Sequence, residues 1–353
     1  MTKVKKVIAM LLVGTLTMGM FVGCGTSKDE EVANSQETAK EESNLEPVEI
    51  VLATAGAPDN IETIYTEKWM DLVTERTDGK VTFDYTNGGA LGGYAELVDG
   101  VNNGAYDMTV TDIGQMVSYV PELEIAGLPF LMEDYDQLKA VYSSDVFDWM
   151  QSCVEEKSNM KLMNAYFCGF RDILSKDELK TIEDFSGYLI RSPQAEAYVE
   201  TFSRLGFSYT TLGWNECYGA MQTGIIDSVE TALMSLYNSG FYDLGKYVLL
   251  TNHMQAVNAL VINEDFWNSL PEEYKSIMSE AIEEIRDAEW EECIAGEEKY
   301  MTLLEEEGVT INEISDEERV KVNELFKPYW SEVAERVGGN SQEMIDKILS
   351  MAK

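Results

Sequence analysis

Strand-type and helix-type segments alternate in the stretch from Glu46 to Asp112. The strand-type runs are short and either largely apolar or alternating, and the first helix-type run places its apolar residues on one face and ends at Gly79. Strands are expected at 46–56, 80–86 and 106–112, and helices within 60–79 and 88–105. Because neighbouring parallel strands need a helical crossover between them, this order predicts a largely parallel sheet covered by helices.

The C-terminal part of the chain is dominated by helix-type sequence. Residues 271–308 form one helical run that is too long for a single small domain. Two closing helices are expected at 318–338 and 341–353. The total of 353 residues suggests two domains of ordinary size. The sequence therefore predicts an α/β protein with two domains.

Arg171 and Arg191 each follow a short apolar run, NAYFCGF and YLI respectively, so both are expected at the end of a strand. Residues 193–206 then form a helix with proline near its start and glycine at its stop. In open α/β sheets ligands bind at the carboxyl ends of strands, and a guanidinium group offers a rigid fork that matches a carboxylate. Both arginines are candidate anion ligands. The alternatives are a surface ion pair or, for Arg171, neutralisation by Asp172 or Asp184.

Acidic residues outnumber basic residues by 64 to 26, which gives a formal net charge of −38 at pH 7. Such a surface repels nucleic acid, so nucleic acid is not an expected partner. It also repels an anionic ligand, although screening over about 8 Å at physiological salt restricts this effect to the near surface. Local arginines would have to attract such a ligand.

Residues for the common catalytic and metal-binding arrangements are scarce. The single histidine, His253, argues against histidine-based metal sites and Ser-His-Asp triads, and is expected to be a packed structural residue. The sequence has no G-x-S-x-G, G-x-G-x-x-G or phosphate-loop motif, so no catalytic residue, metal or cofactor is predicted. The cysteines after Cys24 have no C-x-x-C pair. Buried free thiols are expected, with a Cys153–Cys168 bridge as the alternative.

The N-terminus has the pattern of a secretion signal. Three lysines precede an apolar run, residues 7–23, which glycine and threonine interrupt and which ends at Cys24. The run is short for a membrane span, so residues 1–23 are predicted to be a cleaved signal peptide, with an uncleaved anchor helix as the alternative. The tetrapeptide FVGC resembles a lipobox, with Phe21 where leucine is usual. This resemblance implies that Cys24 becomes the lipid-modified first residue.

Residues 24–46 are predicted to be a disordered acidic tether. After Cys24 the segment has seven acidic residues, two lysines and no aromatic residue. Such a composition cannot bury enough apolar surface to order the chain. The folded part is therefore expected to be extracytoplasmic, held by the lipid at the outer face of the cell membrane.

The stretch from Tyr188 to Met254 carries the most specific pattern in the chain. It has a strand that bears Arg191, then an aromatic residue, a helix and two acidic positions: Trp214, Glu216, Tyr218, Gln222, Gly224, Asp227, Glu230 and Thr231. These residues resemble the central segment of the substrate-binding subunits of tripartite ATP-independent periplasmic (TRAP) transporters, the four-carbon-dicarboxylate-binding-type family. Further matching blocks extend the resemblance over about residues 48–340: Leu91-Gly92, Glu96, Gly104, Asp107-Met108 and 128–141.

The resemblance implies a two-domain periplasmic-binding-protein-like fold with a hinge, in which the long helix spans both domains. Domain I would comprise residues 47–168 and 257–296, and domain II residues 169–256 and 297–353. The resemblance also implies a binding protein and not an enzyme. Such a protein captures a small organic acid in the cleft between the domains and delivers it to TRAP membrane permease subunits.

The resemblance further assigns roles within the cleft. Arg191 would be the main carboxylate clamp and Arg171 a second base. Trp214 would lie against the carbon skeleton of the ligand, and Thr231 occupies a position where many relatives have asparagine. Asp112 would reach a hydroxyl or amine of the ligand from the other domain. The alternatives are core packing for Trp214 and a solvated loop acid for Asp112.

Two other functions are compatible with the sequence. One is a ligand-sensing surface lipoprotein that presents the same cleft to a signalling partner. The other, less favoured, is a secreted hydrolase that uses paired carboxylates, for which 64 acidic residues offer many chance pairs. The arginines expected at strand ends favour the binding protein.

Overall fold

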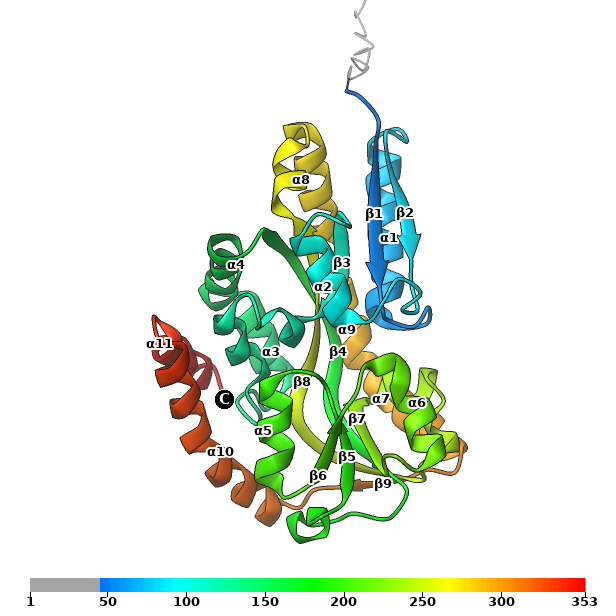
Figure 1. Ribbon diagram of the computed structural model, residues 1–353, viewed down its shortest axis with the longest axis vertical. Coiled ribbons are helices and arrows are strands. Elements are labelled where there is room, and N and C mark those ends of the chain that lie inside the picture. Colours follow the sequence, from blue (N-terminus) through cyan, green and yellow to red (C-terminus); the bar gives the residue numbers. More distant parts are fainter. Residues whose placement is uncertain (1–44, 353) are drawn as a thin grey trace, which may run out of the picture. The chain divides into compact units, whose positions relative to one another are not determined.

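The computed structural model describes residues 45–352 (Figure 1). The predicted signal peptide, Cys24 and the predicted tether up to residue 44 lie outside the described residues. Within residues 45–352, no helix combines the length and the apolar composition that a membrane span requires.

A mixed sheet of nine strands forms the centre of residues 45–352. Its strand order is β2-β1-β3-β8-β4-β7-β5-β6, and β9 pairs with β8 beside this path. The strands are β1 (Val48–Thr54), β2 (Val81–Thr86), β3 (Met108–Asp112), β4 (Met160–Ser175), β5 (Leu189–Ser192), β6 (Ser208–Thr211), β7 (Ser228–Ala232), β8 (Tyr247–Asn263) and β9 (Thr310–Glu313).

The N-terminal part of the sheet has the predicted arrangement. β1 pairs in parallel with β2 and β3, and helices α1 (Ile61–Arg76) and α2 (Tyr94–Asn102) lie in the two connections. The middle of the sheet differs, because β8 pairs antiparallel with β3 and β4, and β4 pairs antiparallel with β7. The prediction of a largely parallel sheet is therefore wrong for these central strands, which run in alternating directions.

β4 and β8 tie the two ends of the sheet together. They have 16 and 17 residues and pair with each other from one end of β4 to the other. Register shifts interrupt this pairing at three places, one of them between Phe167 and Gly169. Gly169 has a φ of 105°, a backbone conformation that favours glycine, so the irregularity depends on this residue. Each of the two strands thus contributes to both halves of the sheet.

The remaining helices cover the sheet. They are α3 (Tyr135–Tyr142), α4 (Asp145–Lys157), α5 (Glu196–Leu205), α6 (Trp214–Thr223), α7 (Leu233–Asn238), α8 (Glu264–Ser269), α9 (Glu272–Glu306), α10 (Asp316–Val337) and α11 (Ser341–Ser350). Short 3-10 turns lie at Ile113–Met116, Pro121–Gly127, Ile182–Phe185 and Phe241–Asp243. The helices expected at 193–206, 271–308, 318–338 and 341–353 correspond to α5, α9, α10 and α11.

The long helix α9 has 35 residues. It contacts α1 and β4, and it also contacts α7 and β9 near the other end of the sheet. Trp290 of α9 stacks on Phe167 of β4 with ring centroids 4.4 Å apart, and its indole nitrogen donates to the carbonyl oxygen of Ala165 at 3.1 Å. This buried tryptophan therefore anchors the helix to the central strands.

The four cysteines of the described residues are buried and free: Cys153, Cys168, Cys217 and Cys293. This confirms the expectation of free thiols and rules out the Cys153–Cys168 bridge for this structure. Packing, and no covalent cross-link, holds the described part of the chain together.

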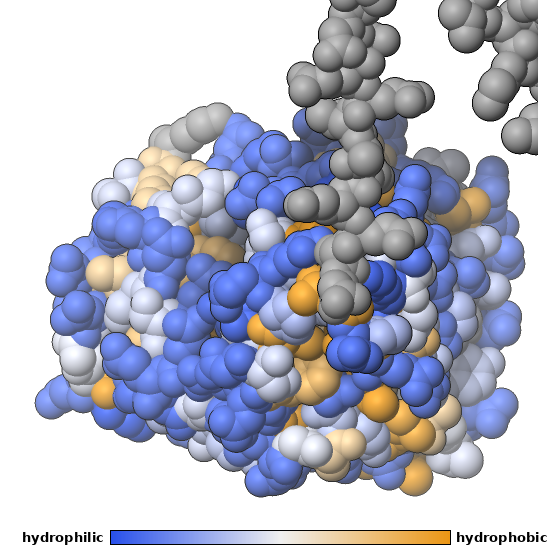
Figure 2. Space-filling model, turned by 90° about the horizontal axis from the view of Figure 1, so that it is seen from above, coloured by the Kyte–Doolittle hydropathy of each residue, from blue (hydrophilic) through white to orange (hydrophobic). Residues whose placement is uncertain are grey.

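Hydrophilic residues cover most of the surface on the face shown in Figure 2.

One acid, Asp172 of β4, is fully buried. Its Oδ1 accepts a hydrogen bond from the backbone nitrogen of Asn252 at 2.9 Å, and its Oδ2 has no partner. Burial raises the pKa of Asp172 from its ordinary value of 3.8 to about 8. Ionisation of this carboxyl group therefore opposes folding.

We expect the free energy of unfolding to fall as pH rises from about 4 to about 8, because Asp172 ionises in the unfolded chain well before it ionises in the fold. Asp172→Asn keeps an acceptor for Asn252 and removes the charge, so this variant should show a weaker pH dependence. Thermal unfolding at several pH values measures the effect. Asp71→Asn, at an exposed position of α1, is the matched control. Equal pH dependence in all three proteins would contradict the assignment.

Candidate functional site

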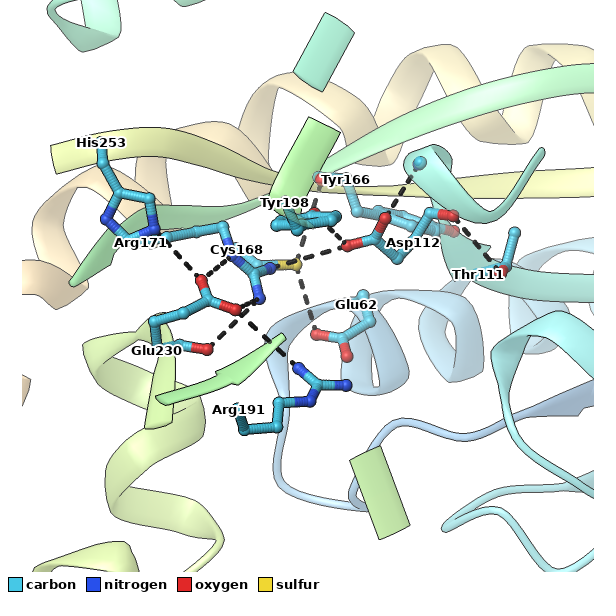
Figure 3. A network of polar contacts seen from close by, with 11 residues as sticks. Glu62, Thr111, Asp112, Tyr166, Cys168, Arg171, Arg191, Tyr198, Glu230 and His253 are labelled. Atoms are coloured by element: carbon cyan, nitrogen blue, oxygen red, sulfur yellow. Dashed lines mark hydrogen bonds and ion pairs between the residues drawn. The ribbon is translucent and has the colours of Figure 1, made fainter. Parts of the chain in front are cut away.

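A cavity lies where both ends of the sheet contribute side chains (Figure 3). It has about 50 Å³ of space for the centres of water-sized molecules, so it suits a small ligand. All five residues predicted to bind ligand are in its wall. The full wall consists of Asn60, Glu62, Tyr94, Asp112, Gln115, Cys168, Arg171, Arg191, Pro193, Trp214, Thr231, Ser235, Ala256 and Asn258.

The cavity continues into a wider cleft of about 350 Å³. The two spaces share the side chains of Tyr94, Gln115, Arg191 and Trp214. The turn that leads into α2 and the start of α6 form the opposite walls of this cleft. A ligand could therefore enter between these two segments and reach Arg191 from the cleft.

Arg171 lies inside β4, which continues to Ser175, so its predicted place at a strand end is wrong. The strand continues because Asp172 to Ser175 pair with β7. Arg171 makes a bidentate ion pair with Glu230 of β7: Nε donates to Oε2 at 2.6 Å and Nη2 donates to Oε1 at 2.9 Å. Both proposed neutralising partners are also wrong. Asp172 binds the backbone of Asn252, and Asp184 accepts from the backbone of residues 180 and 181.

Glu230 is fully buried and is held by more than one base. Nε2 of His253 lies 3.2 Å from Oε2 of Glu230, and Nη1 of Arg191 lies 3.8 Å from Oε1. Burial alone would raise the pKa of Glu230, but Arg171 and His253 lower it to about 2. Glu230 is therefore ionised at neutral pH and cancels the charge of Arg171.

His253 is the packed structural residue that was expected. It has no exposed surface, and its Nδ1 lies 2.7 Å from the hydroxyl oxygen of Thr251. Burial lowers the pKa of His253, while its contact with Glu230 opposes this shift. His253 is not part of the cavity wall, so it does not contact the cavity directly. Its contact with Glu230 orients that carboxylate.

Arg191 is the third residue of β5 and therefore lies near the end of that short strand, as predicted. Its Nε donates to the carbonyl oxygen of Leu212 at 3.0 Å, which fixes the guanidinium plane. The guanidinium carbon lies 5.7 Å from the centre of the Trp214 ring. Glu230 is already held by Arg171, so Arg191 supplies the uncompensated positive charge of the cavity.

Asp112 is the last residue of β3 and comes from the other end of the sheet. Its Oδ1 accepts from the backbone nitrogen of Gly114 at 2.8 Å, and its Oδ2 accepts from the hydroxyl of Tyr198 at 2.9 Å. Nη1 of Arg171 lies 3.6 Å from Oδ2. Burial raises the pKa of Asp112, and Arg171 opposes this effect. Only 8% of Asp112 is exposed, so the alternative of a solvated loop acid is wrong.

Trp214 and Thr231 also take part in the wall. Trp214 is half-buried at the start of α6 and packs on Phe241 with ring centroids 5.4 Å apart, so it serves the core and the cavity together. Thr231 is buried in β7 and presents a short hydroxyl side chain. Glu216 caps α6 by accepting from the backbone nitrogen of Gly213 at 2.9 Å, and so supports the wall from outside.

The sequence analysis missed several polar residues of the wall, above all Glu62. Glu62 lies in the first turn of α1, just after β1, and its Oε1 accepts from the Asn60 side chain at 3.1 Å. Ligands bind at the carboxyl ends of strands in such sheets, so two polar residues where the connection after the first strand enters a helix were a usable signal. Tyr198 was missed for another reason, because its contact with Asp112 joins residues 86 positions apart.

A second cavity, of about 240 Å³, lies between α1, α7 and α9. It shares Cys168 with the first cavity and contains none of the predicted ligand residues. Its charged residues are three acids and Lys299, and most of its wall is apolar. It therefore suits a carboxylate ligand less well than the arginine-containing cavity.

Comparison with known proteins shows the family to which the chain belongs. Residues 52–336 match the model of bacterial extracellular solute-binding proteins, family 7 (DctP). A solute-binding protein of Sulfitobacter sp. is 32% identical over 276 residues, which cover 77% of this chain and 83% of the relative. A solved TRAP periplasmic solute-binding protein of Sulfitobacter sp. with bound α-D-taluronate is 28% identical, with a TM-score of 0.80, over 86% of this chain and 97% of that one. A counterpart of Sulfurospirillum deleyianum with bound succinate is 20% identical, with a TM-score of 0.81, over 87% and 100% of the two chains.

The fold is therefore that of a bacterial extracellular solute-binding protein with two domains. The chain belongs to family 7 of these proteins, the substrate-binding components of TRAP transporters. This confirms the resemblance and the predicted fold class. The relatives are solute-binding proteins and not enzymes, and the family acts outside the cytoplasm on small organic acids.

Replacement of Glu230 by glutamine should destabilise the fold strongly. The variant removes the bidentate partner of the buried Arg171 and leaves only Asp112 at 3.6 Å, and breaking a buried pair costs roughly 3–5 kcal/mol. Glu284→Gln is the control, because Glu284 is the 57% exposed partner of Arg76 and such surface pairs contribute about 0–1 kcal/mol. Chemical denaturation of the two variants measures the difference. Equal small losses would contradict the central role of the Arg171–Glu230 pair.

Proposed function

We propose that this chain captures a small organic acid outside the cytoplasm and delivers it to TRAP membrane permease subunits. The observation that carries the proposal is the buried guanidinium group of Arg191, which faces a small cavity with no full counter-ion among the described residues. A carboxylate would complete this site with charge-assisted hydrogen bonds, each contributing on the order of 1.5–3 kcal/mol.

The other wall residues would share the recognition of the acid. Trp214 would lie against the carbon skeleton, and Thr231 would donate or accept through its hydroxyl. Arg171 would offer the ligand only its Nη1, because Glu230 already accepts from Nε and Nη2. Asp112 would accept from a hydroxyl or amine of the ligand. These roles remain proposals that rest on the convergence of the side chains on one cavity.

We further propose that two domains close over the ligand, domain I being 47–168 and 257–296 and domain II 169–256 and 297–353. These boundaries divide the cavity wall evenly, with seven residues from each proposed domain. β4, β8 and α9 would form the crossing segments, since each of them has contacts at both ends of the sheet. The capture mechanism requires no cofactor, metal or catalytic group.

The proposed location is the outer face of the cell membrane, with a lipid on Cys24 as the anchor. The support comes from the sequence pattern of residues 1–24 and from the extracytoplasmic family. The acidic residues 25–46 would let the folded part move near the permease.

Arg191→Ala should abolish capture of the cognate acid, since the ligand carboxylate would be buried without its partner. The expected loss is roughly 3–5 kcal/mol, or at least about a hundredfold in affinity. Arg191→Lys should restore little, because an ammonium group cannot reproduce the fork. The test is calorimetry with the best ligand from a thermal-shift screen of carboxylates. Arg76→Ala removes an arginine from the surface and is the control. Unchanged affinity in Arg191→Ala would rule out this assignment.

Cys24→Ser should release the protein from membranes, because the lipid would be its only anchor once the signal peptide is cut. Fractionation of cells that express the variant, followed by a carbonate wash, measures the distribution. Cys217→Ser is a useful control, since this cysteine is buried in the folded part. A variant that still pellets with washed membranes would point to an uncleaved helix or another anchor.

A further inference from the structure

A second carboxyl group, that of Glu62, is part of the cavity wall. In the view of Figure 3 its carboxylate lies between Cys168, whose sulfur is 3.5 Å from Oε2, and the guanidinium group of Arg191. Glu62 is only 1% exposed. No lysine, arginine or histidine among residues 45–352 forms an ion pair with it, in contrast to Glu230. The fold therefore buries an acid here without a cation.

The surroundings of Glu62 are built to hold this carboxyl group in place. A side chain at Gly56 would put its Cβ 2.7 Å from Oε1 of Glu62, so the backbone can approach closely only because this residue is glycine. The Asn60 amide donates to the same oxygen at 3.1 Å. Burial raises the pKa of Glu62, and hydrogen bonds from its neighbours oppose that shift. A buried acceptor without a charge partner favours a ligand that donates hydrogen bonds to it.

The charged residues of the wall offer one cation and two acids that lack a close partner of opposite charge. Arg191 carries an uncompensated positive charge, since Arg171 is paired with Glu230. Glu62 has no ion pair, and the only cation near Asp112 is Arg171, at 3.6 Å. A second carboxylate on the ligand would meet these acids and no free arginine. A simple dicarboxylate is therefore disfavoured by like charge.

Several uncharged residues of the wall are polar. They include the amide side chains of Asn60, Gln115 and Asn258 and the phenol of Tyr94. Neutral donors and acceptors of this kind match hydroxyl groups, which both donate and accept. An unsubstituted alkyl chain would leave them and Glu62 desolvated without partners, which is how a polar site rejects an analogue that lacks a hydroxyl.

We propose, on the basis of the proposed function, that Glu62 is a specificity-determining residue that accepts a hydrogen bond from a ligand hydroxyl. The ligand is then a hydroxylated monocarboxylate of the aldonate or uronate class. Its carboxylate binds Arg191, and its hydroxyl groups bind Glu62 and the neighbouring amides. Neither a plain fatty acid nor a plain dicarboxylate fulfils both requirements.

The test compares acids of equal carbon number by calorimetry with the wild-type protein. The panel contains six-carbon aldonates and uronates, including gluconate and galacturonate, with hexanoate, adipate and 6-aminohexanoate as matched analogues. The best hydroxylated acid should bind at least about a hundredfold more tightly than any of these three analogues. Adipate or hexanoate binding as tightly would overturn the inference and leave the proposed function intact. Tightest binding of 6-aminohexanoate would also overturn it, because Glu62 would then select an ammonium group.

The variant Glu62→Gln tests the residue itself. It keeps the shape and one acceptor oxygen but loses the carboxylate, so affinity for the hydroxylated acid should fall about tenfold while adipate gains or is unchanged. The readout is the ratio of the two affinities, which a loss of stability alone would not change. Glu67→Gln, exposed on the same helix, is the control. An unchanged ratio in Glu62→Gln would overturn the inference. If no acid of a wider carboxylate screen bound the wild-type protein, the proposed function would fall as well.

Discussion

The buried ion pair between Arg171 and Glu230 is the interaction on which the cavity depends. Taking two charges out of water costs several kcal/mol per ion, so such a pair persists only when its geometry is favourable and its remaining hydrogen-bonding groups are satisfied. Both conditions are met, because the pair is bidentate and His253 holds the same carboxylate. Since Glu230 is thereby saturated, Arg191 keeps its charge for a ligand. The pair also joins β4 to β7, so the part of the cavity wall that contains Arg171 belongs to the sheet itself.

The two long central strands explain how side chains from distant segments meet. β4 carries Cys168 on one side of the irregularity at Gly169 and Arg171 on the other, and both residues line the cavity. β8 contributes His253 behind Glu230 and Asn258 in the cavity wall. A short strand could not supply both positions. The length of β4 and β8 is therefore a functional property as well as a structural one.

Much of this architecture could be predicted from the sequence, and the failures have a common physical cause. The helix that ends at Gly206 and the placement of Arg191 follow from local patterns, namely a short apolar run and helix boundaries. The partner of Arg171 could not be found in this way, because local acids were considered while Glu230 lies 59 positions away. The strand end expected at Arg171 failed similarly, since pairing with β7 extends β4 beyond it. The position of Glu62 at the start of the first helix could have been noticed, but its burial arises only from tertiary packing.

The four thiols give the protein a further property. Burial raises the pKa of all four cysteines, to about 11 for Cys153 and Cys217 and well above the ordinary value for Cys168 and Cys293. Thiol oxidation and disulfide exchange proceed through the thiolate and require access to it, so these side chains react slowly. A fold without cross-links also has nothing for a reductant to break. The redox state of the surroundings therefore has little hold on residues 45–352, whose structure contains no disulfide and only buried thiols.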